Sequence, residues 1–207
     1  MIRKKAFTLV ELLISTAILS LVVLSLYSAF QVGLASYKRM DSASTVYQAA
    51  RVILNRMELD LKNAFAYSGK DSGFKAQDKV LQFLILQDLF TADGLSSNIC
   101  LIKYNLNGQV LTRICAIGLD ALKTDIALEP DELSADIKEL EFEYAYETDT
   151  PDNPYVWQKG IWPKEGDQSQ VKSLPLAVKV KLLLIERDAL QGETGSVEFS
   201  RIIPLAS

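Results

Sequence analysis

The stretch that decides the fold is the N-terminal sequence MIRKKAFTLVELLIS, residues 1–15, together with the apolar run that continues from it. Basic residues occupy positions 3–5, and a single acid, Glu11, interrupts the apolar residues. Residues 12–37 contain no charged side chain. As a helix these 26 positions extend about 39 Å, which exceeds the roughly 30 Å hydrocarbon core of a bilayer. We therefore predict a transmembrane helix at the N-terminus.

Basic residues flank this run on both sides, at positions 3–5 and at Lys38-Arg39. The first flank carries more charge and usually dominates topology, so we expect the leader in the cytoplasm. Two alternatives stay open on this pattern alone. One is a secretory signal peptide cut among the small residues at 25–35, and the other is an uncleaved signal anchor.

The next segment, residues 38–67, has the pattern of an amphipathic helix. Its apolar residues recur at helical spacing at Val46, Ala50, Ile53, Met57, Leu61 and Phe65. Glu58 and Lys62 stand four positions apart, a favourable spacing for an ion pair on a helix. Serine and glycine at 68–69 and 72–73 predict its end. We expect one long helix whose second half packs on a C-terminal domain.

Residues 68–207 have the pattern of short β-strands separated by turns. Apolar and β-branched runs predict strands at 80–86, 99–106, 110–117, 137–146, 177–185 and 196–203. The sequence shows neither a glycine-rich phosphate loop nor alternating strands and helices, so the sheets are expected to be antiparallel. The predicted fold class is α+β: a long N-terminal helix, with its first half transmembrane, packed on a C-terminal antiparallel β-sheet domain.

Asn107-Gly108 predicts a two-residue hairpin turn, because a type I′ turn needs positive φ at both central positions. The resulting register pairs residues whose numbers sum to 215, and it places Cys100 directly opposite Cys115. At that separation a disulfide between the two cysteines is sterically allowed. Two reduced thiols that pack as small apolar groups are an equal alternative.

The composition narrows the function. The chain has no histidine, so it lacks the Ser/His/Asp triad, the Cys/His dyad and every imidazole metal ligand. Its formal net charge of −4 gives no general attraction for nucleic acid. We expect neither an enzyme nor a cofactor or metal site, and no nucleic acid as a partner.

An acidic cluster admits two interpretations. Its members are Glu129, Asp131, Glu132 and Asp136. They resemble hard-cation ligands in type, but their spacing fits no known calcium loop. Acids after a proline are typical of a helix N-terminus, so the start of a solvated helix or turn is the favoured interpretation.

Two further pairs admit a functional and a structural interpretation. Trp157 and Trp162 either line a partner groove or cover a small core, and the core is favoured. Glu141 and Glu143 share one strand face, as an acid/base couple would. Solvated strands show the same pattern, so this pair alone does not predict catalysis.

The segment Lys5-Ala6-Phe7-Thr8-Leu9-Val10-Glu11 is similar to the signal of prepilins and pseudopilins. In that family a prepilin peptidase cuts on the cytoplasmic side and methylates the new amine, and the apolar segment is kept. Carried over by position, the cleaved bond is Ala6-Phe7 and the methylated residue is Phe7. The chain departs from the pattern at Ala6, where glycine is usual, although both residues are small.

The rest of the chain resembles the J-type minor pseudopilins of type II secretion. The residues that carry this resemblance are Tyr104, Leu106, Gly108, Leu111, Arg113, Leu140, Phe142, Tyr144, Trp157, Trp162, Leu174, Pro175, Leu176, Ala177, Val178, Arg201, Ile202, Ile203, Pro204 and Leu205. The resemblance implies a subunit at the tip of a short pseudopilus that exports folded proteins. Its implied partners are I-type and K-type minor pseudopilins, other pseudopilins and the prepilin peptidase.

The same resemblance implies an organisation along the chain. Residues 1–6 are the leader, 7–37 the transmembrane and filament-core helix, 38–67 the amphipathic helix, and 68–207 a periplasmic β-rich domain held at the inner membrane by one span. The nearest rival is a minor pilin of a type IV pilus, which serves adhesion, motility or DNA uptake. A membrane-anchored enzyme or binding module is the third alternative.

Glu11 is the acid for which this family pattern has a role. A carboxylate buried in hydrocarbon costs about 2.5 to 3.5 kcal/mol unless it is paired. Before cleavage the nitrogen of Phe7 is an amide, and after cleavage it is a cationic amine one helical turn from Glu11. We expect cleavage to create a charge pair that sets the register of subunit assembly. The alternative is that Glu11 lies at the headgroup boundary.

Overall fold

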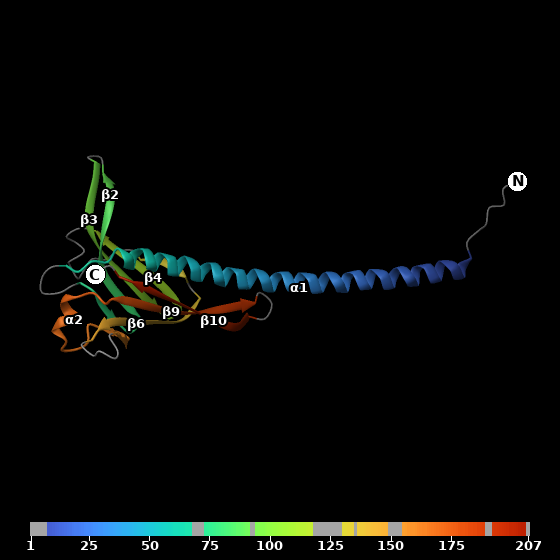
Figure 1. Ribbon diagram of the computed structural model, residues 1–207. Coiled ribbons are helices and arrows are strands. Elements are labelled where there is room, and N and C mark those ends of the chain that lie inside the picture. The colour runs from blue at the N-terminus through green and yellow to red at the C-terminus, as the bar shows by residue number, and fades with distance from the viewer. Residues whose placement is uncertain are drawn as a thin grey trace.

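A single long helix projects from a β-rich body in the computed structural model (Figure 1). The structure describes residues 8–67, 73–91, 94–117, 130–134, 136–148, 155–188 and 192–205. Helix α1, Leu9–Lys62, has 54 residues, and its first half extends away from the body. The predicted fold class, a long N-terminal helix on an antiparallel β-sheet domain, is confirmed.

Helix α1 ends five residues before residue 67, where the sequence pattern placed its end. Its C-cap is Asn63, whose side-chain amide donates to the carbonyl of Leu59 at 3.0 Å. The chain then turns onto the sheet, where the Phe65 N–H donates to the Leu84 carbonyl at 3.1 Å. The expected helical position of Phe65 is therefore wrong, because pairing with a strand replaces the last helical turn.

Among the described residues, the first sheet has six strands in the order β5-β4-β3-β2-β1-β8. Their bounds are β1 Lys75–Gln77, β2 Val80–Thr91, β3 Gly94–Asn107, β4 Val110–Ile117, β5 Asp131–Ser134 and β8 Ile161–Trp162. All of its pairings are antiparallel, as predicted. The β2–β3 hairpin extends beyond the neighbouring strands (Figure 1).

The second sheet, in the part of the chain that the structure describes, has four strands in the order β10-β9-β6-β7, also antiparallel. Their bounds are β6 Ile137–Glu147, β7 Tyr155–Lys159, β9 Ala177–Asp188 and β10 Gly192–Pro204, and a short helix α2, Gln168–Lys172, precedes β9. Strands β1, β5, β7 and β8 were not predicted, because two to five residues are too few to show period-two alternation.

The predicted register of the β3–β4 hairpin is wrong by two residues. Asn107 pairs with Val110, so the turn consists of Gly108 and Gln109. Gly108 has φ of +62° and Gln109 does not have positive φ, which is the pattern of a type II′ turn with glycine first. Consequently Cys100 lies opposite Ile117 rather than opposite Cys115, and both thiols are free in this structure.

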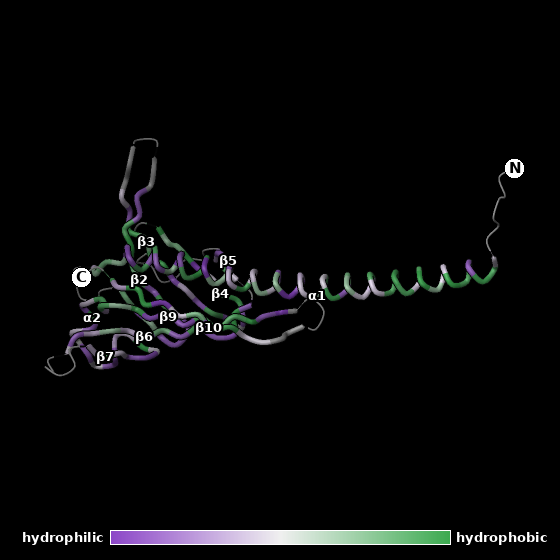
Figure 2. The backbone as a smooth tube through the Cα atoms, turned by 45° about the vertical axis from the view of Figure 1, so that its right-hand side comes forward, coloured by the Kyte–Doolittle hydropathy of each residue, from purple (hydrophilic) through white to green (hydrophobic). Residues whose placement is uncertain are grey.

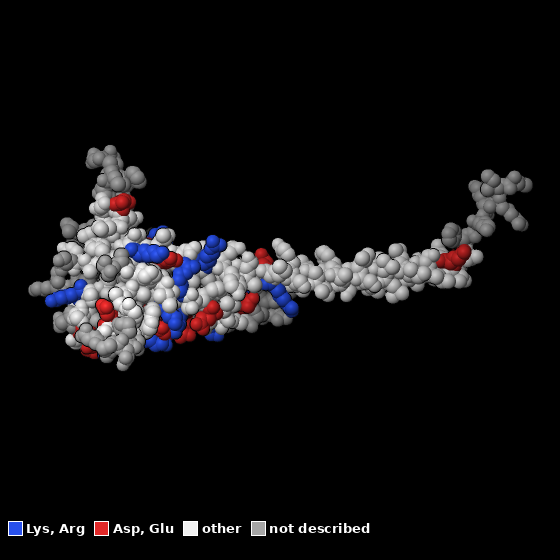
Figure 3. Space-filling view, viewed as in Figure 1, with Lys and Arg blue, Asp and Glu red and all other residues white. Residues whose placement is uncertain are grey.

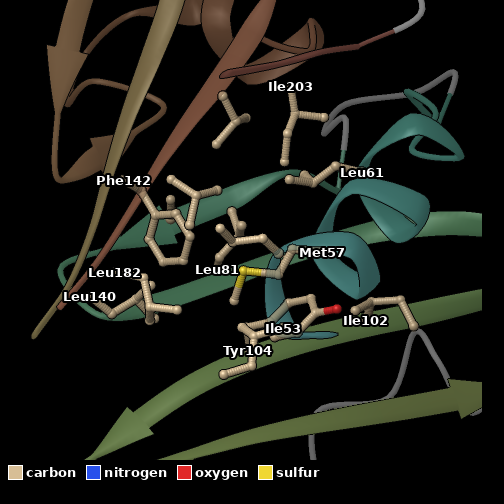
Figure 4. Packing of buried hydrophobic residues seen from close by; sticks show 14 of the residues in the cluster. Ile53, Met57, Leu61, Leu81, Ile102, Tyr104, Leu140, Phe142, Leu182 and Ile203 are labelled. Atoms are coloured by element: carbon tan, nitrogen blue, oxygen red, sulfur yellow. The ribbon is translucent and has the colours of Figure 1, made fainter. Parts of the chain in front are cut away.

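The core lies where the second half of α1 meets both sheets (Figure 4). The helix contributes Ile53, Met57 and Leu61, each 0 or 1% exposed. The helix contacts β9 and β10 of the second sheet and β5 of the first. The sheets contribute apolar residues such as Leu81, Ile102, Tyr104, Leu140, Phe142, Leu182 and Ile203. This burial, at about 1.5 to 3 kcal/mol for a large side chain, holds the helix on the body.

Candidate functional site

The N-terminal end of α1 is closed by a capping box between Thr8 and Glu11. The Thr8 hydroxyl accepts from the Glu11 N–H at 3.3 Å. In return one carboxylate oxygen of Glu11 accepts from the Thr8 N–H at 2.9 Å and from the Thr8 hydroxyl at 3.0 Å. This reciprocal arrangement satisfies two backbone donors that a helix N-terminus otherwise leaves unpaired.

The predicted cleavage and methylation residues, Ala6 and Phe7, lie outside the described residues. Glu11, predicted to form the charge pair used in assembly, is described and differs from expectation, because it already has hydrogen-bond donors in the uncleaved chain. Part of its desolvation cost is therefore offset before any amine exists. Sequence reasoning missed this role, although Thr8 and Glu11 have the S/T-x-x-E spacing of a capping box.

The first half of α1 carries its apolar side chains without cover from the rest of the described chain (Figures 2 and 3). The exposed ones are Leu9, Val10, Leu12, Leu13, Ile14, Ile18, Leu19, Leu21, Val22, Val23, Leu24, Leu26, Tyr27, Phe30, Val32 and Leu34. None of the helix's most apolar 18-residue window is buried, and length and composition alone make α1 a candidate membrane span. So large an apolar surface needs an apolar environment.

Several hydroxyl groups in this half donate to the helix's own backbone. Ser15 donates to the Glu11 carbonyl at 2.7 Å, Ser20 to that of Thr16 at 2.8 Å, and Ser25 to that of Leu21 at 2.9 Å. A helix whose polar side chains bond to its own backbone can enter lipid without leaving those donors unpaired. The hydroxyls therefore do not oppose burial of this half.

The second half of α1 is fixed to the first sheet by a buried ionic cluster. Arg113 of β4 donates from Nε and Nη2 to the two carboxylate oxygens of Asp60, at 2.7 and 3.2 Å. The Tyr104 hydroxyl donates to the same carboxylate at 2.6 Å. All three residues are at most 5% exposed. The bidentate geometry fixes both the axial position and the rotation of the helix on the sheet.

The electrostatics of this cluster favour the ionised pair. Burial acts to lower the pKa of Arg113, but the hydrogen bonds and negative charge of Asp60 outweigh it and the net direction is upward. Burial raises the pKa of Tyr104, and the Asp60 charge raises it further, so the hydroxyl stays a donor. Sequence reasoning missed Asp60, whose only signal is an acid beside the apolar stripe of Met57 and Leu61.

A second, more exposed contact ties the same helix to the second sheet. Arg201 of β10 donates from Nη1 to Glu58 Oε2 at 2.8 Å and to Asn55 Oδ1 at 2.7 Å. The predicted Glu58–Lys62 ion pair is confirmed, with 2.7 Å between Lys62 Nζ and Glu58 Oε1. Helix α1 is thus held by charged contacts to both sheets within one and a half turns.

The predicted pair Glu141 and Glu143 lies on the outer face of the second sheet and is matched by lysines. Lys181 approaches Glu143 Oε1 at 2.6 Å and Glu141 Oε2 at 3.2 Å, and Lys159 approaches Glu141 Oε1 at 2.6 Å. In the register, Glu143 faces Lys159 and Lys179 directly. Hydrogen bonding to Lys181 lowers the pKa of Glu143, so neither acid has the raised pKa of a general acid at neutral pH.

The two tryptophans have different environments. Trp162 is 2% exposed and packs beside Tyr144, as the core interpretation predicted. Trp157 is 42% exposed on the edge strand β7, so for this residue the core interpretation is wrong.

The acidic cluster does not start a helix. Asp131 and Glu132 lie on β5, which pairs with β4, and Asp136 pairs with Arg187 at 2.8 Å. Glu129 lies outside the described residues. Within the described ranges no group of three or more His, Cys, Asp or Glu side chains is placed to hold a metal ion.

Comparisons with known proteins agree with this arrangement. Residues 1–27 match the prokaryotic N-terminal methylation motif. A type IV-like pilin from Thermus thermophilus has the same fold, with a TM-score of 0.52 at 11% identity over 77% of this chain and 94% of that pilin. Comparison with curated proteins gives no significant match. The chain therefore has a type IV pilin-like fold. The prepilin-type methylation motif and this fold together support the pilin and pseudopilin superfamily and a membrane-anchored protein.

Proposed function

We propose that this chain is a prepilin-type structural subunit that acts as a J-type minor pseudopilin at the tip of a type II secretion pseudopilus. In this proposal it is cleaved between Ala6 and Phe7, methylated at Phe7, and held at the inner membrane with its β-rich domain in the periplasm. The observation that carries the proposal is that the first half of α1 exposes its apolar side chains, while the second half is packed on the β-rich body.

The size of that surface argues for two successive apolar environments. Burying each large aliphatic side chain is worth about 1.5 to 3 kcal/mol, so ten such side chains favour burial by more than about 15 kcal/mol. A bilayer provides this burial for a single subunit. Neighbouring apolar helices provide it in a filament, so the same surface supports storage in the membrane and assembly out of it.

The capping box supports a specific role for Glu11 in that assembly. It holds the carboxylate at the helix N-terminus, bonded to the N–H of Thr8, which is the residue after Phe7. Cleavage between Ala6 and Phe7 puts a cationic amine one residue beyond that N–H. The new cation therefore arises beside an anion that is already in position, in the same chain or a neighbouring one.

The J-type assignment rests on the resemblance in the later segments of the sequence. The buried ionic cluster around Asp60 gives a physical role to two of the residues that carry this resemblance. Tyr104 and Arg113 are the sheet residues that donate to the Asp60 carboxylate, so this part of the pattern positions the helix on the sheet. The I-type and K-type minor pseudopilins are the proposed partners. A minor pilin of a type IV pilus is the second candidate, because it requires the same helix and the same processing.

The test is expression of the full chain in a strain with a type II secretion system and its prepilin peptidase. Intact-mass analysis of the membrane-purified protein is expected to show a chain that starts at N-methylated Phe7. Glu11→Gln should leave this mass pattern unchanged, apart from the substitution, and reduce co-purification of the I-type and K-type partners about tenfold or more, equivalent to about 1.4 kcal/mol. Glu58→Gln, on the domain half of the same helix, is the matched control.

Three results would contradict the proposal in separable ways. A chain that keeps Met1, or one that starts beyond residue 35, excludes prepilin processing. Partner recovery that is equal for Glu11→Gln and wild type excludes the charge pair. If deletion of the gene abolishes surface pili but leaves export of folded proteins intact, the pseudopilin assignment is wrong and the minor pilin assignment takes its place.

A further inference from the structure

Cys100 and Cys115 form a diagonal pair on the core-facing side of the first sheet. Cys100 of β3 pairs with Ile117, and Cys115 of β4 pairs with Ile102, so the two cysteines are one diagonal step apart. Side chains alternate between faces, and an offset of two residues keeps both thiols on the same face. Their neighbours on this face include Ile85 and Phe83 of β2.

A shared hydrogen-bond acceptor places an upper limit on the separation of the two sulfurs. Cys100 Sγ donates to Gln87 Oε1 at 3.3 Å, and Cys115 Sγ donates to the same oxygen at 3.7 Å. The sum of these distances limits the separation of the two sulfurs to 7.0 Å. Diagonal neighbours in a flat sheet lie about 7 to 8 Å apart at Cα, beyond the usual disulfide range of roughly 4.4 to 6.8 Å, so a bridge requires the two strands to move closer together.

The end of β4 that carries Cys115 has a single partner strand among the described residues. Among the described residues, β5 pairs with β4 only at Leu111–Arg113, and residues 114–117 pair only with β3. A shift of this end toward β3 therefore breaks no other described strand pairing. Such a shift is what a diagonal disulfide requires.

The two thiols differ in burial. Cys100 is fully buried, and burial together with the adjacent Cys115 thiol raises its pKa to about 11. Cys115 is half-buried and lies nearer to solvent. Because the thiolate is the nucleophile, the first reaction with an external reagent is expected at Cys115.

We propose that Cys100 and Cys115 are a redox-sensitive pair that closes to an intrachain disulfide when the chain meets an oxidising disulfide. The Cys115 thiolate attacks one sulfur of that disulfide and releases the other as a thiolate. Cys100 then loses its proton to the medium, attacks Cys115 Sγ in the mixed disulfide, and expels the second thiolate. Two electrons pass to the external disulfide, which becomes two thiols with the two protons released. Only the expectation that an oxidising compartment supplies this reagent rests on the proposed function.

The consequence is a reversible staple between β3 and β4. A diagonal bridge is under more strain than a directly opposed one, and strained disulfides are easier to reduce. Closing it also removes both donors from Gln87 Oε1, at the base of the projecting part of the β2–β3 hairpin. The bond therefore exchanges two hydrogen bonds at that base for one covalent link.

The experiment uses the full chain, reduced and then freed of reductant in detergent, with oxidised glutathione as the oxidant and rapid alkylation to stop the reaction. Intact mass is expected to fall by two hydrogens, and peptide mapping to show Cys100 linked to Cys115. Before oxidation, alkylation of the folded Cys100→Ser variant at Cys115 should be at least tenfold faster than alkylation of Cys115→Ser at Cys100. Excess reduced glutathione should reverse the link.

A register control makes the outcome decisive. The double variant Cys115→Ser, Ile117→Cys places a cysteine directly opposite Cys100. That position is a non-hydrogen-bonded pair with Cα atoms about 4.5 Å apart, inside the disulfide range. The control should close more completely than the native pair at the same ratio of oxidised to reduced glutathione. The proposal is overturned if the control closes while the native pair keeps two free thiols, or if the native pair closes only in urea.

Discussion

The two halves of helix α1 show how one continuous helix can serve two environments. Val46 is the first buried residue along it, and the buried residues from there are Val46, Ala50, Ile53, Leu54, Met57, Asp60 and Leu61. Far from the body, residues 9–34 carry mostly apolar side chains that nothing in the described chain covers. The difference lies in the partner and not in helix propensity, because both halves keep one unbroken hydrogen-bond ladder.

This contrast shows what the sheets contribute: they cover the second half of the helix and leave the first half exposed to other molecules. The second half is amphipathic, and its stripe is complementary to two sheets and carries one buried acid. The first half is apolar on every side, which suits lipid and a bundle of like helices equally well. Substitutions in the two halves should therefore affect different measurements.

The largest effect is expected from Asp60→Ala in the anchored half. Removal of the carboxylate leaves Arg113 buried with its charge unpaired, and breaking a buried pair in this way costs about 3 to 5 kcal/mol. Urea unfolding of the full chain in detergent, followed by the fluorescence of buried Trp162, measures the loss. A cost under about 1 kcal/mol would mean that the cluster does not hold the helix.

A triple variant separates the cost of an orphaned charge from the value of the pair. Asp60→Leu, Tyr104→Phe and Arg113→Met together remove the carboxylate and both of its donors. Replacing a buried ion pair by apolar residues of similar size is often neutral or stabilising, so most of the lost stability should return. If the triple variant is as unstable as Asp60→Ala, packing and not desolvation explains the loss.

The next effect compares the same substitution in the two halves. Leu61 is 0% exposed and Leu24 is 63% exposed on the same helix. Leu61→Ala should lower the free energy of unfolding by about 2 to 5 kcal/mol, because it removes buried methyl groups and leaves a cavity. Leu24→Ala should change it by less than about 0.5 kcal/mol. Equal losses at the two positions would show that the projecting half is packed against the body.

The same contrast explains which features the sequence could predict. The apolar run, the stripe of Val46, Ala50 and Met57, and the long strands all follow from residue periodicity, which is local information. The end of α1 does not, because Phe65 continues the helical pattern and only the backbone of β2 draws it away. The strand β5 was missed for the same reason, since its pairing with β4 is a tertiary contact.

The sequence predicted the functional roles that depend on local patterns, but it did not predict the buried cluster around Asp60. Glu11 stands out as the single acid in an apolar run, and Glu58–Lys62 is a local spacing on one helix. Asp60, by contrast, is distinguished from other helical acids only by residues 44 and 53 positions away. The cysteine register failed by two residues because both Asn107-Gly108 and Gly108-Gln109 can form a two-residue turn, and the sheet selected the second.

The smallest expected effect is a pH dependence that distinguishes Glu58 from Glu11. The hydrogen bond from Lys62, with the added charge of Arg201, lowers the pKa of Glu58 from its ordinary value of 4.5. The unfolded chain then binds more protons than the folded chain near that pH. The stability from Glu58 is therefore fully present above pH 4.5 and is lost as pH falls through the lower pKa of the folded chain.

Glu58→Gln should have a shallower decline of the urea midpoint in this range than wild type, and the difference should shrink in high salt. Glu11→Gln is the matched control, because among the described residues the Glu11 carboxylate is hydrogen-bonded to Thr8, far from the domain, and its loss should leave the domain's acid response unchanged. Parallel curves for wild type and Glu58→Gln would show that Arg201 and Lys62 do not couple the charge of this half of the helix to folding.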